Sequence, residues 1–260
     1  MITSLKNPKV QQVRSLLNRR AERAQQKAFV AEGVRLVEEA LQAGWPAQQV
    51  FYCAGVSPRG WQAAQAYAAL GAEMEEVTPA VMQALSGTET PQGIMAVLSD
   101  HELPLPPAPD FLLVADGVRD PGNLGTLLRS AAAAGVQAVF LPPGTVDAFA
   151  PKVVRSAMGA HFRLPIRALD WPWLDAWRTA APRPWRIFLA EAESGTPCWR
   201  ADLRQPLMLI IGGEAEGAGP EAAGRVDERL SIPMPGQFES LNAGVAASIL
   251  LFEVVRQRSL

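Results

Sequence analysis

One stretch near the middle of the chain decides the fold, and it reads FLLVADGVRDPGNLGTLLRSAAAAGVQAVFL over residues 111–141. Its opening run, Phe111 to Ala115, is apolar without interruption, which is typical of a strand buried on both faces. A turn with glycine and a helix-like segment from Leu124 to Ala134 follow, and Ala138 to Leu141 supply a second strand. This alternation predicts a mostly parallel sheet that helices cover on both faces.

The same alternation continues to the end of the chain. Three further apolar runs are predicted strands: Ile187 to Ala190, Leu207 to Ile211 and Leu230 to Pro233. A last helix is predicted from Leu241 to Arg256, with Leu241, Val245, Ile249 and Phe252 on one face. Residues 111–260 therefore form a parallel-sheet α/β domain.

A proline-rich segment precedes this domain, with four prolines in the twelve residues from Ser99 to Asp110. Proline removes hydrogen-bond donors and favours extended backbone, so residues 100–110 are a predicted semi-rigid linker. Residues 1–99 alternate less regularly and predict a smaller α/β domain. Its expected helices cover Val10 to Arg23, Val34 to Ala43 and Trp61 to Leu70, and its strands lie at Phe29-Val30, Val50 to Cys53 and Ile94 to Leu98.

Composition restricts the class of protein but names no partner. The 260 residues are 48% hydrophobic and 19% charged, which is ordinary for a globular protein. The net charge of −2 hides an asymmetry, because residues 1–27 hold seven Lys or Arg against one acid and the rest carries about −8. Cys53 and Cys198 form neither a disulfide framework nor a zinc cluster, and no segment is a secretory signal or long enough to span a bilayer. We expect a cytoplasmic protein with no membrane partner.

Three strand ends are rich in glycine and polar residues, and ligands of parallel sheets gather at such ends. These segments run from Asp116 to Arg129, from Ile211 to Gly217 and from Ile232 to Asn242. Taken singly, each also fits a tight glycine turn or a helix cap at Asn123 or Ser240. Arg129 belongs to a helix of apolar and small residues, where an arginine serves a ligand or an interface better than a core.

Familiar sites are absent from the sequence. No G-x-x-x-x-G-K-[ST] phosphate loop occurs, and the first glycine segment lacks both the G-x-G-x-x-G spacing and an acidic residue about twenty positions later. A Ser-His-Asp hydrolase needs a placed histidine, whereas His101 lies in the linker and His161 in a basic segment. No set of residues has metal-ligand spacing, so no metal is expected.

Together the three segments resemble the SpoU (TrmH) family of RNA 2′-O-ribose methyltransferases, within the SPOUT superfamily. The resemblance rests on Asn123-x-Gly125-x-x-x-Arg129, on Gly212-Gly213-Glu214 with Gly217, and on Ile232-Pro233-Met234 followed by Ser240-Leu241-Asn242. The segments Phe29 to Gly33 and Pro91 to Ile94 are similar to the RNA substrate-binding domain that is often fused to this family. The resemblance covers nearly the whole chain.

The family implies a trefoil knot in the carboxyl-terminal domain, a rare exception to the rule that chains do not thread loops, and a homodimer formed through that domain. It implies S-adenosylmethionine as the cofactor, bound by Gly212, Gly213, Ile232, Met234, Ser240, Leu241 and Asn242. Arg129 would activate the 2′-hydroxyl, supported by Asn123 and Glu214. Because a guanidinium holds its proton, Arg129 could equally grip a phosphate and stabilise charge on the ribose oxygen. One departure is Gly244, where the family commonly has serine.

Charge indicates where RNA would bind. The segment from Ala150 to Arg167 contains four basic residues and no acid, and with the first helix it offers two positive patches, although both could be ordinary solvated faces. The predicted RNA-binding residues are Lys6, Lys9, Arg14, Arg19, Arg20, Lys152 and Arg155. Ribosomal RNA is the favoured substrate and transfer RNA the second. The alternative is a noncatalytic RNA-binding or ribosome-assembly factor with the same fold.

Overall fold

In the computed structural model the chain folds into two compact units. Unit 1 comprises Met1–Glu102 and Phe149–Phe162, and unit 2 comprises Leu103–Ala148 and Arg163–Leu260. The structure describes residues 1–192, 194–214, 216–236 and 239–259. Ala215, Gln237 and Phe238, which belong to the glycine-rich segments named above, lie outside the described residues.

Unit 2 is built on the parallel sheet that the sequence predicts. Over the described residues its strands are β5 (Phe111–Asp116), β6 (Ala138–Leu141), β7 (Ile166–Ala168), β8 (Arg186–Glu191), β9 (Thr196–Pro197), β10 (Leu207–Gly212) and β11 (Glu228–Ser231). They lie in the order β7-β6-β5-β10-β8-β11-β9, and each neighbouring pair is parallel. The predicted mixed α/β class with a parallel carboxyl-terminal sheet is confirmed.

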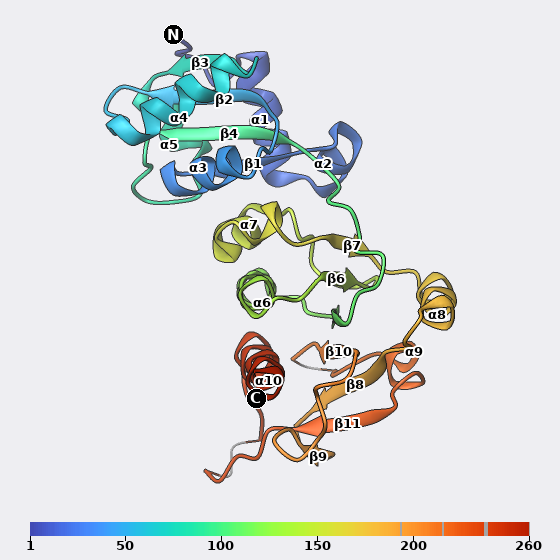
Figure 1. Ribbon diagram of the computed structural model, residues 1–260. Helices are drawn as coiled ribbons and strands as arrows, with labels where there is room; N and C mark the ends of the chain where they lie inside the picture. Colours follow the sequence, from blue (N-terminus) through green and yellow to red (C-terminus); the bar gives the residue numbers. More distant parts are fainter. Residues whose placement is uncertain (193, 215, 237–238, 260) are drawn as a thin grey trace. The chain divides into compact units, whose positions relative to one another are not determined.

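Helices cover both faces of this sheet (Figure 1). On one face α6 (Pro121–Ala134) packs against α10 (Ala243–Arg258), and on the other lie α8 (Trp171–Ala180) and the short α9 (Pro220–Ala223). Trp185 is fully buried beneath α8 and donates its indole N–H to the Pro109 carbonyl at 2.6 Å. Because both faces are covered, β5 and β10 are buried along almost their whole length, which explains their uninterrupted apolar runs.

The second half of the predicted linker is held against unit 2. The Arg167 guanidinium donates to the Leu103 carbonyl, and Arg258 bonds the Asp110 carboxylate at 3.2 Å. Leu105 packs on the core beneath α8. Side chains from distant elements thus fix the proline-rich segment up to the first residue of β5.

Unit 1 has a four-stranded mixed sheet in the order β1-β4-β2-β3. The strands are β1 (Ala28–Glu32), β2 (Ala47–Cys53), β3 (Glu73–Val77) and β4 (Ile94–Ser99). Helices α1 (Pro8–Asn18) and α5 (Pro79–Leu85) pack on one face, and α3 (Val34–Gln42) and α4 (Pro58–Ala69) contact the strands as well. Residues 149–162 of unit 1, which interrupt unit 2 in the sequence, are called the inserted segment. They add α7 (Pro151–Ala157) and the 3₁₀ helix η1 (Ala160–Phe162).

The amino-terminal helix differs from the prediction. In place of one helix from Val10 to Arg23, the structure has α1 and α2 (Arg20–Gln26), separated by extended backbone at Arg19. Arg23 is buried and donates to the Leu16 carbonyl at 2.5 Å, so it satisfies the end of α1 and does not face solvent. Within the described residues, no helix has the length and the apolar run that a membrane crossing needs.

Candidate cofactor and catalytic site

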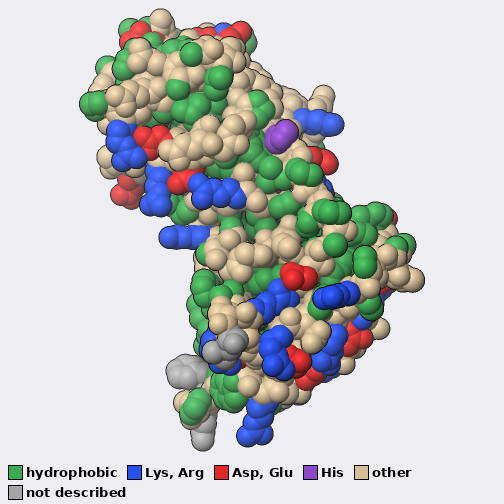
Figure 2. Space-filling view, in the orientation of Figure 1, with side chains coloured by type: hydrophobic (Ala, Val, Ile, Leu, Met, Phe, Trp, Pro, Cys, Tyr) green, Lys and Arg blue, Asp and Glu red, His purple; other side chains and the backbone are tan. Residues whose placement is uncertain are grey.

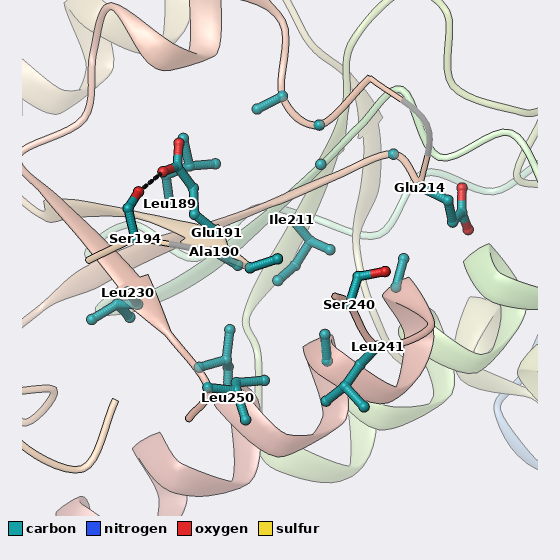
Figure 3. A pocket seen from close by; sticks show the side chains of 18 of the residues that line it. Leu189, Ala190, Glu191, Ser194, Ile211, Glu214, Leu230, Ser240, Leu241 and Leu250 are labelled. Atoms are coloured by element: carbon teal, nitrogen blue, oxygen red, sulfur yellow. Dashed lines mark hydrogen bonds between the residues drawn. The ribbon is translucent and has the colours of Figure 1, made fainter. Parts of the chain in front are cut away.

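A cavity of about 950 Å³ opens at the carboxyl ends of the parallel strands of unit 2 (Figure 3). Its wall includes the residues after β10, the residues after β11 and the first turns of α10. Of the predicted site residues, Gly212, Gly213, Glu214, Ile232, Met234, Ser240 and Leu241 line it. Strand ends far apart in sequence meet here because parallel strands end at one edge of their sheet.

Two glycine turns make contact at the floor of this site. Gly212 pairs with Asp116 across the β10–β5 ladder, and Gly213 pairs with Gly217 through two backbone hydrogen bonds of 3.1 Å. A Cβ on Gly213 would lie 2.3 Å from the Gly117 carbonyl oxygen, which belongs to the turn after β5. No side chain fits there, so the first two glycine-rich segments meet backbone to backbone.

A chain of side-chain hydrogen bonds joins all three motifs. The Asn242 amide donates to Asn123 Oδ1 at 2.8 Å, and the Asn123 amide donates to the Glu214 carboxylate. Asn242 is also the N-cap of α10, since its Oδ1 accepts from the N–H groups of Gly244 and Val245. Asn242 and Asn123 themselves lie outside the wall of the cavity, and together they hold Glu214 on it.

Gly244, the departure from the family pattern, lies where α10 crosses α6. A Cβ at this position would approach Thr126 to 3.2 Å, which is tighter than ordinary packing. One turn later Ser248 donates to the Gly244 carbonyl and shares a 2.7 Å hydrogen bond with Ser130 of α6. Glycine in place of serine therefore lets α10 and α6 approach each other closely. The contact lies next to Asn123, the residue that links the motifs.

Arg129 lies on α6 and is exposed. It follows Asn123 by six residues, which is about 9 Å along the helix axis, and it does not line the cavity. Within the described ranges, no residue forms a hydrogen bond or ion pair with its side chain. The structure thus gathers Asn123, Glu214 and Asn242 and leaves Arg129 pointing to solvent on the same helix.

The cavity suits the cofactor that the resemblance implies. Small-molecule sites commonly enclose about 300–1,000 Å³ with apolar walls and few polar groups. Here Ile211, Leu230 and Leu250 give an apolar wall, and the side-chain-free Gly212 and Gly213 leave backbone accessible at the strand end. A cofactor the size of S-adenosylmethionine fits this volume and this mixture of groups.

The sequence did not identify one wall of the cavity, which comes from β8 and the residues after it. Glu191 and Ser194 lie there, and Figure 3 shows the hydrogen bond between them. The run Ile187 to Ala190 predicts the strand, but only the strand order places its end beside β10. Glu216 and Glu239 add two more acidic side chains to the lining.

The predicted RNA-binding residues all belong to unit 1 and differ in their surroundings. Lys6, Arg14 and Arg20 are exposed, and Arg19 lies 4.0 Å from Glu22. Lys9 pairs with Glu73 and Glu75, and these hydrogen bonds raise the pKa of its ammonium. In the inserted segment, Arg155 pairs at 3.4 Å with Glu32, and Lys152 belongs to the same helix, α7.

Figure 2 shows Lys and Arg side chains next to Asp and Glu over the drawn face of unit 2. Several arginines of unit 2 form ion pairs, among them Arg178–Asp227, Arg186–Glu228 and Arg225–Asp175.

Comparison with protein families gives two matches that together span most of the chain. Residues 110–252 match the model of the SpoU rRNA Methylase family, and residues 7–96 match the MRM3-like substrate binding domain. The first match runs without interruption through the segment 149–162 that packs with unit 1.

Individual relatives agree with these matches. The chain is 34% identical to the 23S rRNA (guanosine(2553)-2′-O)-methyltransferase RlmP of Bacillus subtilis, over 97% of this chain and 98% of that protein. It is similar in structure to the AdoMet-bound rRNA methyltransferase from Sinorhizobium meliloti, with a TM-score of 0.86 and 32% identity over 98% of this chain and 97% of the other. The AdoMet complex of the SpoU methyltransferase AviRb from Streptomyces viridochromogenes also gives a TM-score of 0.86, with 29% identity over 97% and 99% of the two chains.

We predict that Gly213→Ala destroys the cofactor cavity. The added methyl would collide with the Gly117 carbonyl, so the turn after β10 must move, at a cost of about 1–3 kcal/mol in the free energy of unfolding. Calorimetric titration should show at least about a tenfold loss of affinity for S-adenosylmethionine. Gly224→Ala is the matched control, because its added methyl would approach the nearest atom only to 3.3 Å, against 2.3 Å at Gly213, and Gly224 does not line the cavity. Unchanged affinity in Gly213→Ala would contradict the tight contact between the turns.

Proposed function

Because the chain belongs to the SpoU rRNA methylase family, we propose that it transfers a methyl group from S-adenosylmethionine to a ribose 2′-hydroxyl of ribosomal RNA. The observation that carries this proposal is the hydrogen-bonded chain Asn242–Asn123–Glu214 at the rim of a cofactor-sized cavity. The names of the relatives support ribosomal RNA over transfer RNA as the substrate. A noncatalytic RNA-binding factor has no need for this arrangement.

The cofactor would be held by Gly212, Gly213, Ile232, Met234, Ser240 and Leu241, with Asn242 fixing the start of α10 behind them. S-adenosylmethionine, when bound, supplies a methyl group activated by its sulfonium. Methyl transfer to a ribose oxygen requires that the oxygen be positioned in line and that its developing negative charge be stabilised. We assign this stabilisation to Arg129, which stays protonated and also suits the neighbouring phosphate. Asn123 acts as a positioning residue, because it orients the Glu214 carboxylate at the cavity.

We further propose that unit 2 forms a homodimer through α10. Three apolar side chains, Val245, Ile249 and Phe252, lie in one stripe along this helix and are 45%, 40% and 49% exposed. Leu241, just before the helix, is 36% exposed and also lines the cavity. A second copy covering the stripe would bury this apolar surface next to the cofactor site. The trefoil knot remains part of the proposal, supported by the insertion of β10 between β5 and β8 and by the fold family of the solved neighbours.

We assign residues 1–99 to RNA binding, residues 100–110 to the linker and residues 111–260 to catalysis. The match of residues 7–96 to a substrate-binding domain supports this division, as do the exposed basic residues of α1 and α2. Cys53 and Cys198 are free and buried, which agrees with a reducing cytoplasm, and bacterial rRNA methyltransferases are among the relatives.

We predict that Arg129→Ala abolishes methylation and leaves cofactor binding nearly intact. Loss of a preorganised charge stabiliser typically lowers turnover by about 10²–10³-fold, and Arg129 does not line the cavity. Transfer of a radioactive methyl group from S-adenosylmethionine to ribosomal RNA measures turnover, and calorimetry measures binding. Arg204→Ala, an exposed arginine paired with Asp202, is the matched control. Near-normal turnover in Arg129→Ala would remove this residue from the mechanism, and absence of turnover in the wild type on both ribosomal and transfer RNA would favour the noncatalytic factor.

We predict that the exposed basic residues in and next to α1 and α2 contribute to RNA affinity. Replacing Lys6, Arg14, Arg19 and Arg20 by glutamine should weaken binding and reduce the slope of log K against log salt by up to roughly 3. Lys9→Gln serves as the control, because Glu73 and Glu75 already neutralise this ammonium. Its loss should change the slope less than the loss of any exposed lysine or arginine. Filter binding across a salt series measures both. An unchanged slope in the fourfold variant would show that this surface does not touch RNA.

We predict that Ile249→Asp with Phe252→Asp yields a monomer. Two buried carboxylates would oppose any interface that covers the stripe on α10. Sedimentation should give about half the mass of the wild type. Leu70→Asp, which changes an apolar side chain of unit 1 that is 73% exposed, should leave the mass unchanged. A monomeric wild type, or a dimeric double variant, would refute this interface.

A further inference from the structure

Glu191 is an acidic residue of the cavity that none of the three sequence motifs contains. It is the last residue of β8, a parallel neighbour of β10. The ladder pairs Leu189 with Ile210, and two further residues along both strands bring Glu191 level with Gly212. The backbone of Glu191 therefore lies level with the last residue of β10, and its side chain is part of the cavity lining.

The Glu191 carboxylate is held in place by its own partners. Ser194 Oγ donates to Oε2 at 2.6 Å, and the Arg229 guanidinium donates to Oε1. Each carboxylate oxygen can accept two hydrogen bonds, so these partners leave acceptor capacity on both. The side chain is 27% exposed, which is enough to meet a ligand in the cavity without being freely mobile.

The surroundings of Glu191 indicate which part of the cofactor it would meet. Leu189 and Leu230 lie near it on the cavity wall, whereas Glu214, which accepts a hydrogen bond from Asn123, lies at the opposite end (Figure 3). If the sulfonium were held at the Glu214 end, one arm of the cofactor would reach the Glu191 end, and the apolar Leu189 and Leu230 there would suit the adenosine arm better than the charged methionine arm. A carboxylate that only accepts hydrogen bonds suits the vicinal hydroxyls of a ribose.

Sheets that bind dinucleotides use a comparable arrangement, in which an acidic residue some twenty positions after the glycine turn takes a ribose hydroxyl. In this chain the corresponding acid precedes the glycine turn, because β8 comes before β10 in sequence and beside it in the sheet. Resting on the proposed function, we infer that Glu191 binds the cofactor by accepting hydrogen bonds from its ribose hydroxyls, with Ser194 and Arg229 as positioning residues.

Calorimetric titration of the full-length protein with S-adenosylmethionine tests this inference. Glu191→Gln should bind about tenfold more weakly, as expected when one charge-assisted hydrogen bond is lost. Glu228→Gln is a matched control, because the Glu228–Arg186 pair joins the same two strands with similar exposure, 23% and 43% against 27% and 45%, and does not line the cavity. It should bind like the wild type. Wild-type affinity in Glu191→Gln would overturn the inference.

A second titration separates recognition from a structural effect. The probes are S-adenosylhomocysteine and its 2′-deoxyribose counterpart. The wild type should bind the deoxy compound about tenfold more weakly, and Glu191→Gln should bind both almost equally. If Glu191→Gln still binds the deoxy compound about tenfold more weakly than S-adenosylhomocysteine, Glu191 only supports the loop and the inference fails.

Arg229→Ala completes the test, since it removes the ion pair and leaves the carboxylate. Arg229→Ala should still bind the deoxy compound more weakly than S-adenosylhomocysteine. Equal affinity for the two compounds, with the carboxylate still present, would show that Glu191 does not recognise the ribose. Failure of the proposed function gives a different result, because a wild type that binds neither S-adenosylmethionine nor S-adenosylhomocysteine refutes both proposals at once.

Discussion

The site depends on one close contact between two turns of the backbone. The turn after β10 approaches the turn after β5 so closely that a Cβ on Gly213 would meet the Gly117 carbonyl oxygen at 2.3 Å. Asp116 adds to this contact, because its carboxylate accepts the Gly219 N–H at 2.7 Å. With these turns fixed, Glu214 comes within reach of Asn123, and the cavity has a rigid floor. A shift of either turn would therefore move the proposed catalytic residues and the proposed cofactor-binding residues together.

Small residues also allow the close contact between α6 and α10. Gly244 lets the helices approach at Thr126, and Ser130 and Ser248 form a hydrogen bond across them. Asn242 caps α10 and donates to Asn123 on α6, so the start of one helix is tied to the first turn of the other. Because one face of α10 borders the cavity and another carries the exposed apolar stripe, cofactor binding and a proposed subunit contact share a single helix.

The sequence predicts those features of the fold that a short, continuous residue pattern determines. Strands buried on both faces show as apolar runs, which is why β5, β6, β8 and β10 were found. By contrast β3 reads Glu-Met-Glu-Glu-Val, and only its partner β2 makes it a strand. Arg23 appears basic and solvated in sequence, yet it folds back to the end of α1. The position of Glu191 in the cavity lining could not be predicted, because it depends on β8 lying beside β10, and no local pattern contains the strand order.

The charge of the cavity explains why glycine turns at strand ends serve a different ligand here than in phosphate-binding folds. Its described lining includes Glu191, Glu214, Glu216 and Glu239 and contains neither lysine nor arginine. Such a wall repels a pyrophosphate and favours a sulfonium cation. Exposed basic residues lie instead on α1 and α2 of unit 1, where RNA binding is proposed, while several arginines of unit 2 are paired with acids. A net charge of −2 thus includes an acidic cavity wall in unit 2 and exposed basic residues in unit 1, to which the proposed function assigns ligands of opposite sign.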